Sequence, residues 1–244
     1  MTKRIALIHA TPLAIEPIAA AFRALWPEAR TTNLLEDSLS QDLAAAGKLE
    51  PAMFQRFCDL ATYAERSGAD AILFTCSAFG ACIETARRLV SIPVLKPNEA
   101  MIDEALAAGR RLALIASFAP SLPSMVAEFE EAAAARGIKL ELTTHAVEGA
   151  MPALAAGDAD LHDRLIAEVV ASIGPVDAMI LAQFSMARAE PAVAQVVRGR
   201  VLTSPKSAVE RLRVLLDEPV PAIESMRGRL RGIDTGVSRG PDRG

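Results

Sequence analysis

The chain has 244 residues, of which 51% are hydrophobic, and this apolar share supports a folded core and excludes a disordered chain. The 26 basic and 30 acidic residues are interspersed and give a net charge of −4, so the basic face typical of nucleic-acid binding is absent. No apolar run reaches the roughly 18 residues of a membrane helix, and three cysteines do not make a disulfide framework, which favours a reducing, cytoplasmic location.

Short apolar runs alternate with Ala-rich helical segments along the chain. The expected strands are residues 3–8, 29–33, 70–75, 93–96, 111–116, 139–145, 177–182 and 200–203. The expected helices are residues 12–25, 51–67, 80–90, 98–108, 121–136, 158–173, 186–198 and 206–216. Continuous apolar strands separated by helices indicate parallel sheets covered on both faces, so the expected fold class is α/β.

An internal repeat divides the chain. Residues 4–22 (RIALIHATPLAIEPIAAAF) align without a gap with residues 111–129 (RLALIASFAPSLPSMVAEF), and this alignment defines the repeat offset. The same offset aligns Asp70-Ala71 with Asp177-Ala178 and Val94-Leu95 with Val201-Leu202. The repeat predicts two pseudo-symmetric, flavodoxin-like halves, each a short parallel sheet flanked by helices, with a ligand cleft between them.

We expect three regions on this basis. Residues 1–97 together with 206–216 form the first half, and residues 98–205 form the second half. Residues 217–244 are expected to be a mobile tail, because they are rich in Pro, Gly and balanced charges.

The motif Thr75-Cys76-Ser77 follows an apolar strand and precedes a helix. Free backbone N–H groups and the helix dipole at such a turn stabilise a thiolate and can bind a carboxylate. Cys76 is therefore the candidate nucleophile or acid–base group, and an inert buried cysteine is the alternative. Cys58 and Cys82 lie on expected helices and are assigned to core packing.

These features resemble the aspartate/glutamate/hydantoin racemase superfamily, which also includes maleate cis-trans isomerase and arylmalonate decarboxylase. The resemblance rests on the repeat, the Thr-Cys-Ser motif and the matching strand ends, and it covers residues 3–216. It implies one cysteine at a strand end in each half, with the two thiols on opposite sides of a small carboxylate. One thiol removes a proton next to the carboxylate and the other returns a proton, without a metal or an organic cofactor.

The sequence departs from that pattern at one position, because the repeat offset pairs Cys76 with Gln183. An amide forms hydrogen bonds but does not exchange protons near neutral pH, which argues against a symmetric two-thiol racemase. The leading hypothesis is a racemase or isomerase that acts on a small carboxylate by cysteine-based proton transfer or covalent addition. The alternatives are a single-cysteine decarboxylase or lyase, and a ligand-binding relative without activity.

Further candidate site residues follow the strand ends. His9 is a candidate proton-transfer partner, because an imidazole has a pKa of about 6.5, and a structural hydrogen-bonding role is the alternative. Lys96 is a candidate partner of a substrate carboxylate, and an exposed loop lysine is the alternative. The remaining expected substrate-binding residues are Thr11, Thr75, Ser77, Ala78, Ser117, Phe118, Gln183, Phe184 and Ser185.

The sequence contains no dinucleotide-binding or P-loop glycine motif and no cluster with metal-ligand spacing, so neither a cofactor nor a metal is expected. The expected partners are a small carboxylate and a second copy of the chain in a homo-oligomer. Phe79, Phe118, Phe184 and Met186 indicate a partly apolar binding site. His162 is expected at the exposed start of a helix.

Overall fold

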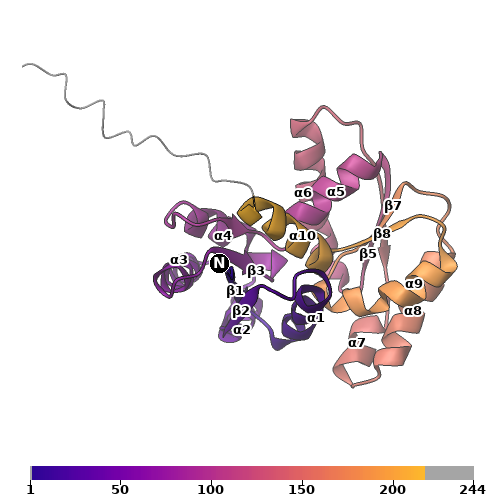
Figure 1. Cartoon of the computed structure of the whole chain (residues 1–244). Helices are drawn as coiled ribbons and strands as arrows, with labels where there is room; N and C mark the ends of the chain where they lie inside the picture. Colours follow the sequence, from indigo (N-terminus) through magenta and orange to yellow (C-terminus); the bar gives the residue numbers. More distant parts are fainter. Residues whose placement is uncertain (1, 218–244) are drawn as a thin grey trace, which may run out of the picture.

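Two parallel four-stranded sheets form the centre of the computed structural model, which describes residues 2–217 (Figure 1). The first sheet, in the order β2-β1-β3-β4, contains β1 (Arg4–His9), β2 (Arg30–Leu35), β3 (Ala71–Phe74) and β4 (Val94–Leu95). The second, in the order β6-β5-β7-β8, contains β5 (Arg111–Ala116), β6 (Glu141–Ala146), β7 (Ala178–Leu181) and β8 (Arg200–Thr203). All eight expected strands are present, and the expected α/β class with two similar halves is confirmed.

Burial separates the central strands from the edge strands. The strands β1, β3, β5 and β7 are apolar and almost completely buried, because helices cover both faces of each sheet. The strands β2 and β6 are polar and partly exposed, as is typical of strands at the edge of a sheet.

Helices surround both sheets. Those of the first half are α1 (Ile15–Leu25), α2 (Ser38–Ala46), α3 (Pro51–Arg66), α4 (Gly80–Arg87) and α10 (Ser204–Asp217). Those of the second half are α5 (Glu99–Ala108), α6 (Leu122–Ala135), α7 (Ala150–Ala155), α8 (Ala159–Ala171) and α9 (Glu190–Val196). The sequence analysis missed α2 and α7, which are short helices directly after the edge strands. Asp217 still belongs to α10, and the rest of the expected tail lies outside the described residues.

A short 3-10 turn follows each of the four central strands. The turns are η1 (Pro12–Ala14), η2 (Ser77–Phe79), η3 (Ala119–Ser121) and η4 (Phe184–Ala189). Each turn leads directly into a longer helix, so the expected helices after these strands begin with a tighter turn. The four turns lie at the carboxyl ends of the strands, where open α/β folds bind ligands.

The strand registers reproduce the repeat. In the first half Ile8 pairs with Phe74, and at the equivalent positions of the second half Ile115 pairs with Leu181. The hydrogen bonds at the base of the sheets repeat as well. The N–H of Arg4 donates to Asp70 Oδ2 at 2.7 Å, and the N–H of Arg111 donates to Asp177 Oδ2 at 2.9 Å. The pseudo-symmetry therefore extends to individual backbone bonds.

The chain passes from one half to the other before α5 and again before α10. The helix α10 packs on the first sheet through Ala208, Val209 and Leu212, whereas α5 packs on the second sheet through Met101 and other apolar residues. Figure 1 shows α10 between the two halves. Within the described residues, no helix combines the length and the apolar character that crossing a membrane requires.

Candidate functional site

A cavity of about 570 Å³ lies between the two halves, at the carboxyl ends of the central strands. All four 3-10 turns contribute to its wall. Nine of the expected site residues line it, namely Thr11, Thr75, Cys76, Ser77, Ala78, Phe118, Gln183, Phe184 and Ser185. The other three, His9, Lys96 and Ser117, are not part of the wall.

Cys76 directly precedes η2 and is partly buried. Burial raises the pKa of the Cys76 thiol, and a hydrogen bond from the backbone of Ala78 lowers it only in part. The sequence analysis expected the helix terminus to favour the thiolate. Desolvation of the thiolate outweighs this hydrogen bond, so burial favours the protonated thiol at neutral pH.

Gln183 occupies the matching position before η4 in the second half. Its Oε1 accepts hydrogen bonds from the N–H of Ser117 at 2.8 Å and from Ser117 Oγ at 3.2 Å. Its Nε2 donates to Ser121 Oγ at 2.8 Å. Because a backbone N–H can only donate, the contact with Ser117 determines which end of the amide carries the oxygen. Ser117 therefore holds Gln183 from behind the cavity wall.

His9 is completely buried below the cavity. Its Nδ1 lies 2.9 Å from Thr75 Oγ1 and its Nε2 lies 2.9 Å from Asn33 Oδ1. Burial lowers the pKa of His9, against the opposite effect of the Asn33 hydrogen bond, so the ring is neutral at pH 7. In this arrangement both ring nitrogens bind protein groups, and His9 supports Thr75, which does line the cavity.

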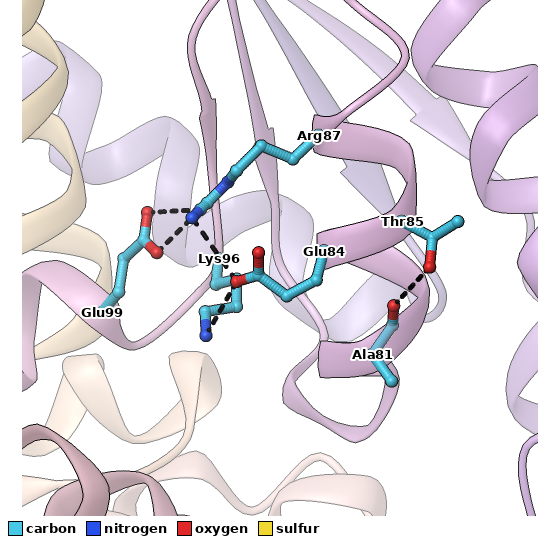
Figure 2. Close-up of polar contacts among 6 residues, drawn as sticks. All are labelled: Ala81, Glu84, Thr85, Arg87, Lys96 and Glu99. Carbon is cyan, nitrogen blue, oxygen red and sulfur yellow. Dashed lines mark hydrogen bonds and ion pairs between the residues drawn. The ribbon is translucent and has the colours of Figure 1, made fainter.

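Lys96 pairs with a protein carboxylate and does not line the cavity. Its Nζ lies 3.1 Å from Glu84 Oε1, and Arg87 binds Glu99 with an N–O distance of 2.7 Å in the same network (Figure 2). The pairing with Glu84 neutralises the charge that the sequence analysis assigned to a substrate carboxylate.

Tertiary structure adds wall residues that the sequence analysis missed. The helix α2 contributes Ser40, Leu43 and Ala44, and α7 contributes Met151. The further residues of the wall are Leu13, Ala14, Phe79, Pro97, Asn98, Ser121, Ser124 and Ala182. The left-handed glycine after α2, Gly47 with φ of 67°, is a local signal that identifies the end of that helix.

Two other expectations are corrected by burial. Met186 is completely buried in the core of the second half and does not line the cavity. His162 is also completely buried, because α8 packs against η4, and its Nδ1 lies 2.7 Å from Asp163 Oδ1. The expectation of an exposed His162 is wrong.

Most of the wall surface is apolar, and the described wall residues carry no ionic side chain. Cys76 carries the only titratable side chain among the described residues that line the cavity. None of these residues is Asp, Glu, Lys, Arg or His. Hydroxyl and amide groups supply its polarity, beside apolar residues such as Phe79 and Leu43. Cys76 is therefore the only described wall residue whose side chain exchanges protons, and the other polar side chains of the wall are neutral hydroxyls and amides.

Comparisons with known proteins agree with this architecture. The family model described as Asp/Glu/Hydantoin racemase matches residues 8–212. A comparison with curated proteins gives no match. Among solved structures, an aspartate racemase homologue from Pyrococcus horikoshii OT3 is 19% identical with a TM-score of 0.66, over 89% of this chain and 100% of that chain.

Two further structures share the fold. Glutamate racemase from Thermus thermophilus, in complex with β-chloro-D-alanine, is 20% identical with a TM-score of 0.59, over 88% of this chain and 81% of its own. A glycine-to-cysteine variant of arylmalonate decarboxylase, in a sulfate-associated form, is 17% identical with a TM-score of 0.64, over 88% of this chain and 94% of its own. The family model covers most of the chain, and this chain belongs to the Asp/Glu/hydantoin racemase family.

Proposed function

We propose that this chain is a cofactor-independent enzyme that acts on a small carboxylate, with Cys76 as its acid–base group. One observation carries the proposal: Cys76 is the only titratable side chain among the described wall residues of the cavity between the halves. Family membership supports the same class of chemistry. The position facing it in the repeat holds Gln183, whose amide does not exchange protons.

A protonated thiol suits a reaction in which the enzyme delivers a proton. Because burial raises the pKa of Cys76, its S–H form prevails, and a bound carboxylate would favour that form further. Two-base racemisation needs a second proton-transfer group on the opposite face of the substrate. The wall offers Gln183 there, which favours chemistry on one face.

The reaction that fits best is decarboxylation followed by protonation at carbon. The bond between the α-carbon and one carboxyl group breaks, CO2 leaves, and the electron pair remains on the α-carbon, delocalised into the second carboxyl group. The Cys76 S–H proton then bonds to that carbon, and the resulting thiolate takes a proton from water. Apolar wall residues such as Phe79 and Leu43 would favour departure of the carboxylate group as neutral CO2, because they solvate a carboxylate poorly. The negative charge moves to the α-carbon and the second carboxyl group.

Racemisation or isomerisation is the second candidate, and family membership favours it. A single thiol is sufficient for cis-trans isomerisation, in which the thiolate adds to a double bond and leaves after rotation about the resulting single bond. This route requires the thiolate of Cys76, which burial disfavours and the Ala78 hydrogen bond favours.

Incubation with 2-substituted malonic acids, maleate, aspartate and glutamate in deuterium oxide separates these reactions. The proposed reaction releases CO2 and leaves one deuterium on the α-carbon in a single configuration. Loss of chirality in recovered substrate would instead indicate racemisation, and changed alkene geometry would indicate isomerisation.

Replacement of the thiol tests the assignment of Cys76. We expect Cys76→Ala to abolish turnover and Cys58→Ala, a matched change on α3, to retain it. Full activity of Cys76→Ala would disprove the proposal. Absence of turnover with every acid, together with binding of one of them, would favour the ligand-binding alternative.

A further inference from the structure

Asn98 lies where the chain passes from the first half to the second. It follows Lys96-Pro97 after β4 and immediately precedes α5. Asn98 lines the cavity although only 2% of its surface is exposed. It was not among the expected site residues.

An Asn before a helix ordinarily caps the first turn with its side chain. Asn98 makes no such capping bond. Its Oδ1 instead accepts a hydrogen bond from Ser204 Oγ at 2.8 Å. Ser204 begins α10, where the chain returns to the first half, so one bond joins the two crossings. In this arrangement Ser204 holds the oxygen end of the amide, and the same hydroxyl also lies 3.4 Å from Met101 Sδ.

The other end of the amide has no partner. Within residues 2–217, Asn98 Nδ2 is buried and forms no hydrogen bond. Buried donors in proteins are nearly always paired, so an unpaired amide on a cavity wall indicates a group that binds there. The second half offers no equivalent, because the repeat offset pairs Asn98 with Pro205.

The side chains of the wall limit how the proposed carboxylate substrate could be held. The described wall residues carry no cation, and Glu84 binds the nearby Lys96. A carboxylate in this cavity therefore needs neutral donors, and an amide supplies two N–H groups. Oxygen acceptors that carry a charge form the stronger hydrogen bonds.

We propose that Asn98 Nδ2 donates to a carboxylate oxygen of the substrate and that Ser204 is the positioning residue that orients the amide. This inference rests on the proposed function and specifies how the anion is held on the Cys76 side of the cavity.

Side-chain amide NMR tests the contact with malonate as the probe, independently of turnover. Titration with malonate is expected to shift the Nδ2 resonances of Asn98 in ¹⁵N-labelled protein, whereas those of Asn33 and Gln55, which lie outside the wall, stay in place. The variant Asn98→Asp identifies the resonances by their loss. Unmoved Asn98 resonances at saturating malonate would overturn the inference.

Affinity gives the second measurement. Asn98→Asp retains an oxygen for Ser204 but replaces both N–H donors by a negative charge, so malonate binding is expected to weaken by about 10- to 100-fold. Ser204→Ala retains the donors and is expected to weaken binding less. Should Asn98→Asp fail to fold, sequential backbone assignment of the wild-type protein identifies the Asn98 side-chain resonances, and the wild-type titration decides.

Protection of Cys76 from iodoacetamide reports occupancy of the cavity separately. If malonate protects Cys76 equally in wild type and Asn98→Asp at the same concentrations, this inference is wrong and the proposed function stands. If malonate neither binds nor protects Cys76 in the wild-type protein, both this inference and carboxylate binding at Cys76 fail.

Discussion

Two opposing effects act on the pKa of the Cys76 thiol. Its place after a strand and before a turn supplies the N–H of Ala78, which favours the thiolate, while its burial favours the thiol. Burial prevails because desolvation of the thiolate outweighs that one hydrogen bond. Burial also acts on His9, but there it lowers the pKa, because the charged form of an imidazole is a cation. The neutral ring is therefore the stable form.

Alkylation kinetics measure the result for Cys76. We expect the rate of its reaction with iodoacetamide to rise with pH, with a midpoint above the pKa of about 8.5 of a free thiol. The reason is that the thiolate is the reactive form and burial disfavours it. The measurement follows the Cys76 peptide by mass spectrometry in the Cys58→Ala protein, with a free cysteine peptide as reference. A midpoint at or below that of the peptide would contradict this assignment.

The burial of His9 predicts a loss of stability in acid. Unfolded chains bind a proton at His below a pH of about 6.5, whereas the folded pKa is lower, so the free energy of unfolding decreases as the pH falls through this range. The slope reaches at most about 1.4 kcal/mol per pH unit. Denaturant unfolding at several pH values compares wild type with His9→Gln, which does not titrate. Equal acid slopes in the two proteins would refute a buried neutral His9.

At the scale of elements, the short segments around the cavity determine its wall. Cys76 and Gln183 directly precede two of the four 3-10 turns, η2 and η4, at equivalent positions. The helices α2 and α7 add Leu43 and Met151 to the wall. The long helices and apolar strands were predictable, because each carries a periodic pattern over many residues. The helix α7 has only six residues, and α2 buries only Leu39, so neither shows a clear apolar period.

Gly47 ends α2 in the left-handed region with φ of 67° and has open space around it. We expect Gly47→Ala to lower the free energy of unfolding by about 1 kcal/mol, because an alanine is strained at this φ. Gly174 also has open space, but its φ lies outside the left-handed region, so Gly174→Ala is the matched control and is expected to be neutral. Urea unfolding measures both, and equal stabilities would contradict the role of Gly47 as the end of α2.

At the scale of the whole molecule, two similar halves enclose a site with different groups on its two faces. The repeat pairs the thiol of Cys76 with the amide of Gln183, and it pairs Asn98 with Pro205. Both differences lie at the cavity or at the crossings beside it, as the proposed one-sided chemistry requires.

Gln183→Cys tests this asymmetry by adding a thiol to the second face. We expect the deuterated product of this variant to contain both configurations, where the wild type yields one. Its stability is expected to fall by about 1–3 kcal/mol, because the N–H of Ser117 loses its acceptor. Gln183→Ala loses the same hydrogen bond without gaining a thiol and is the control. A single configuration in the product of Gln183→Cys would show that the added thiol does not protonate the second face of the substrate.

By itself, the sequence determined the doubled α/β fold and the position of Cys76 relative to Gln183. Both follow from local apolar patterns and from one constant offset, which need no knowledge of distant contacts. Only the tertiary structure decided that the Cys76 thiol is protonated, that Lys96 binds Glu84, and that Asn98 has an unpaired amide in the cavity wall. Burial and choice of partner depend on residues far apart in the chain, and no local pattern encodes them.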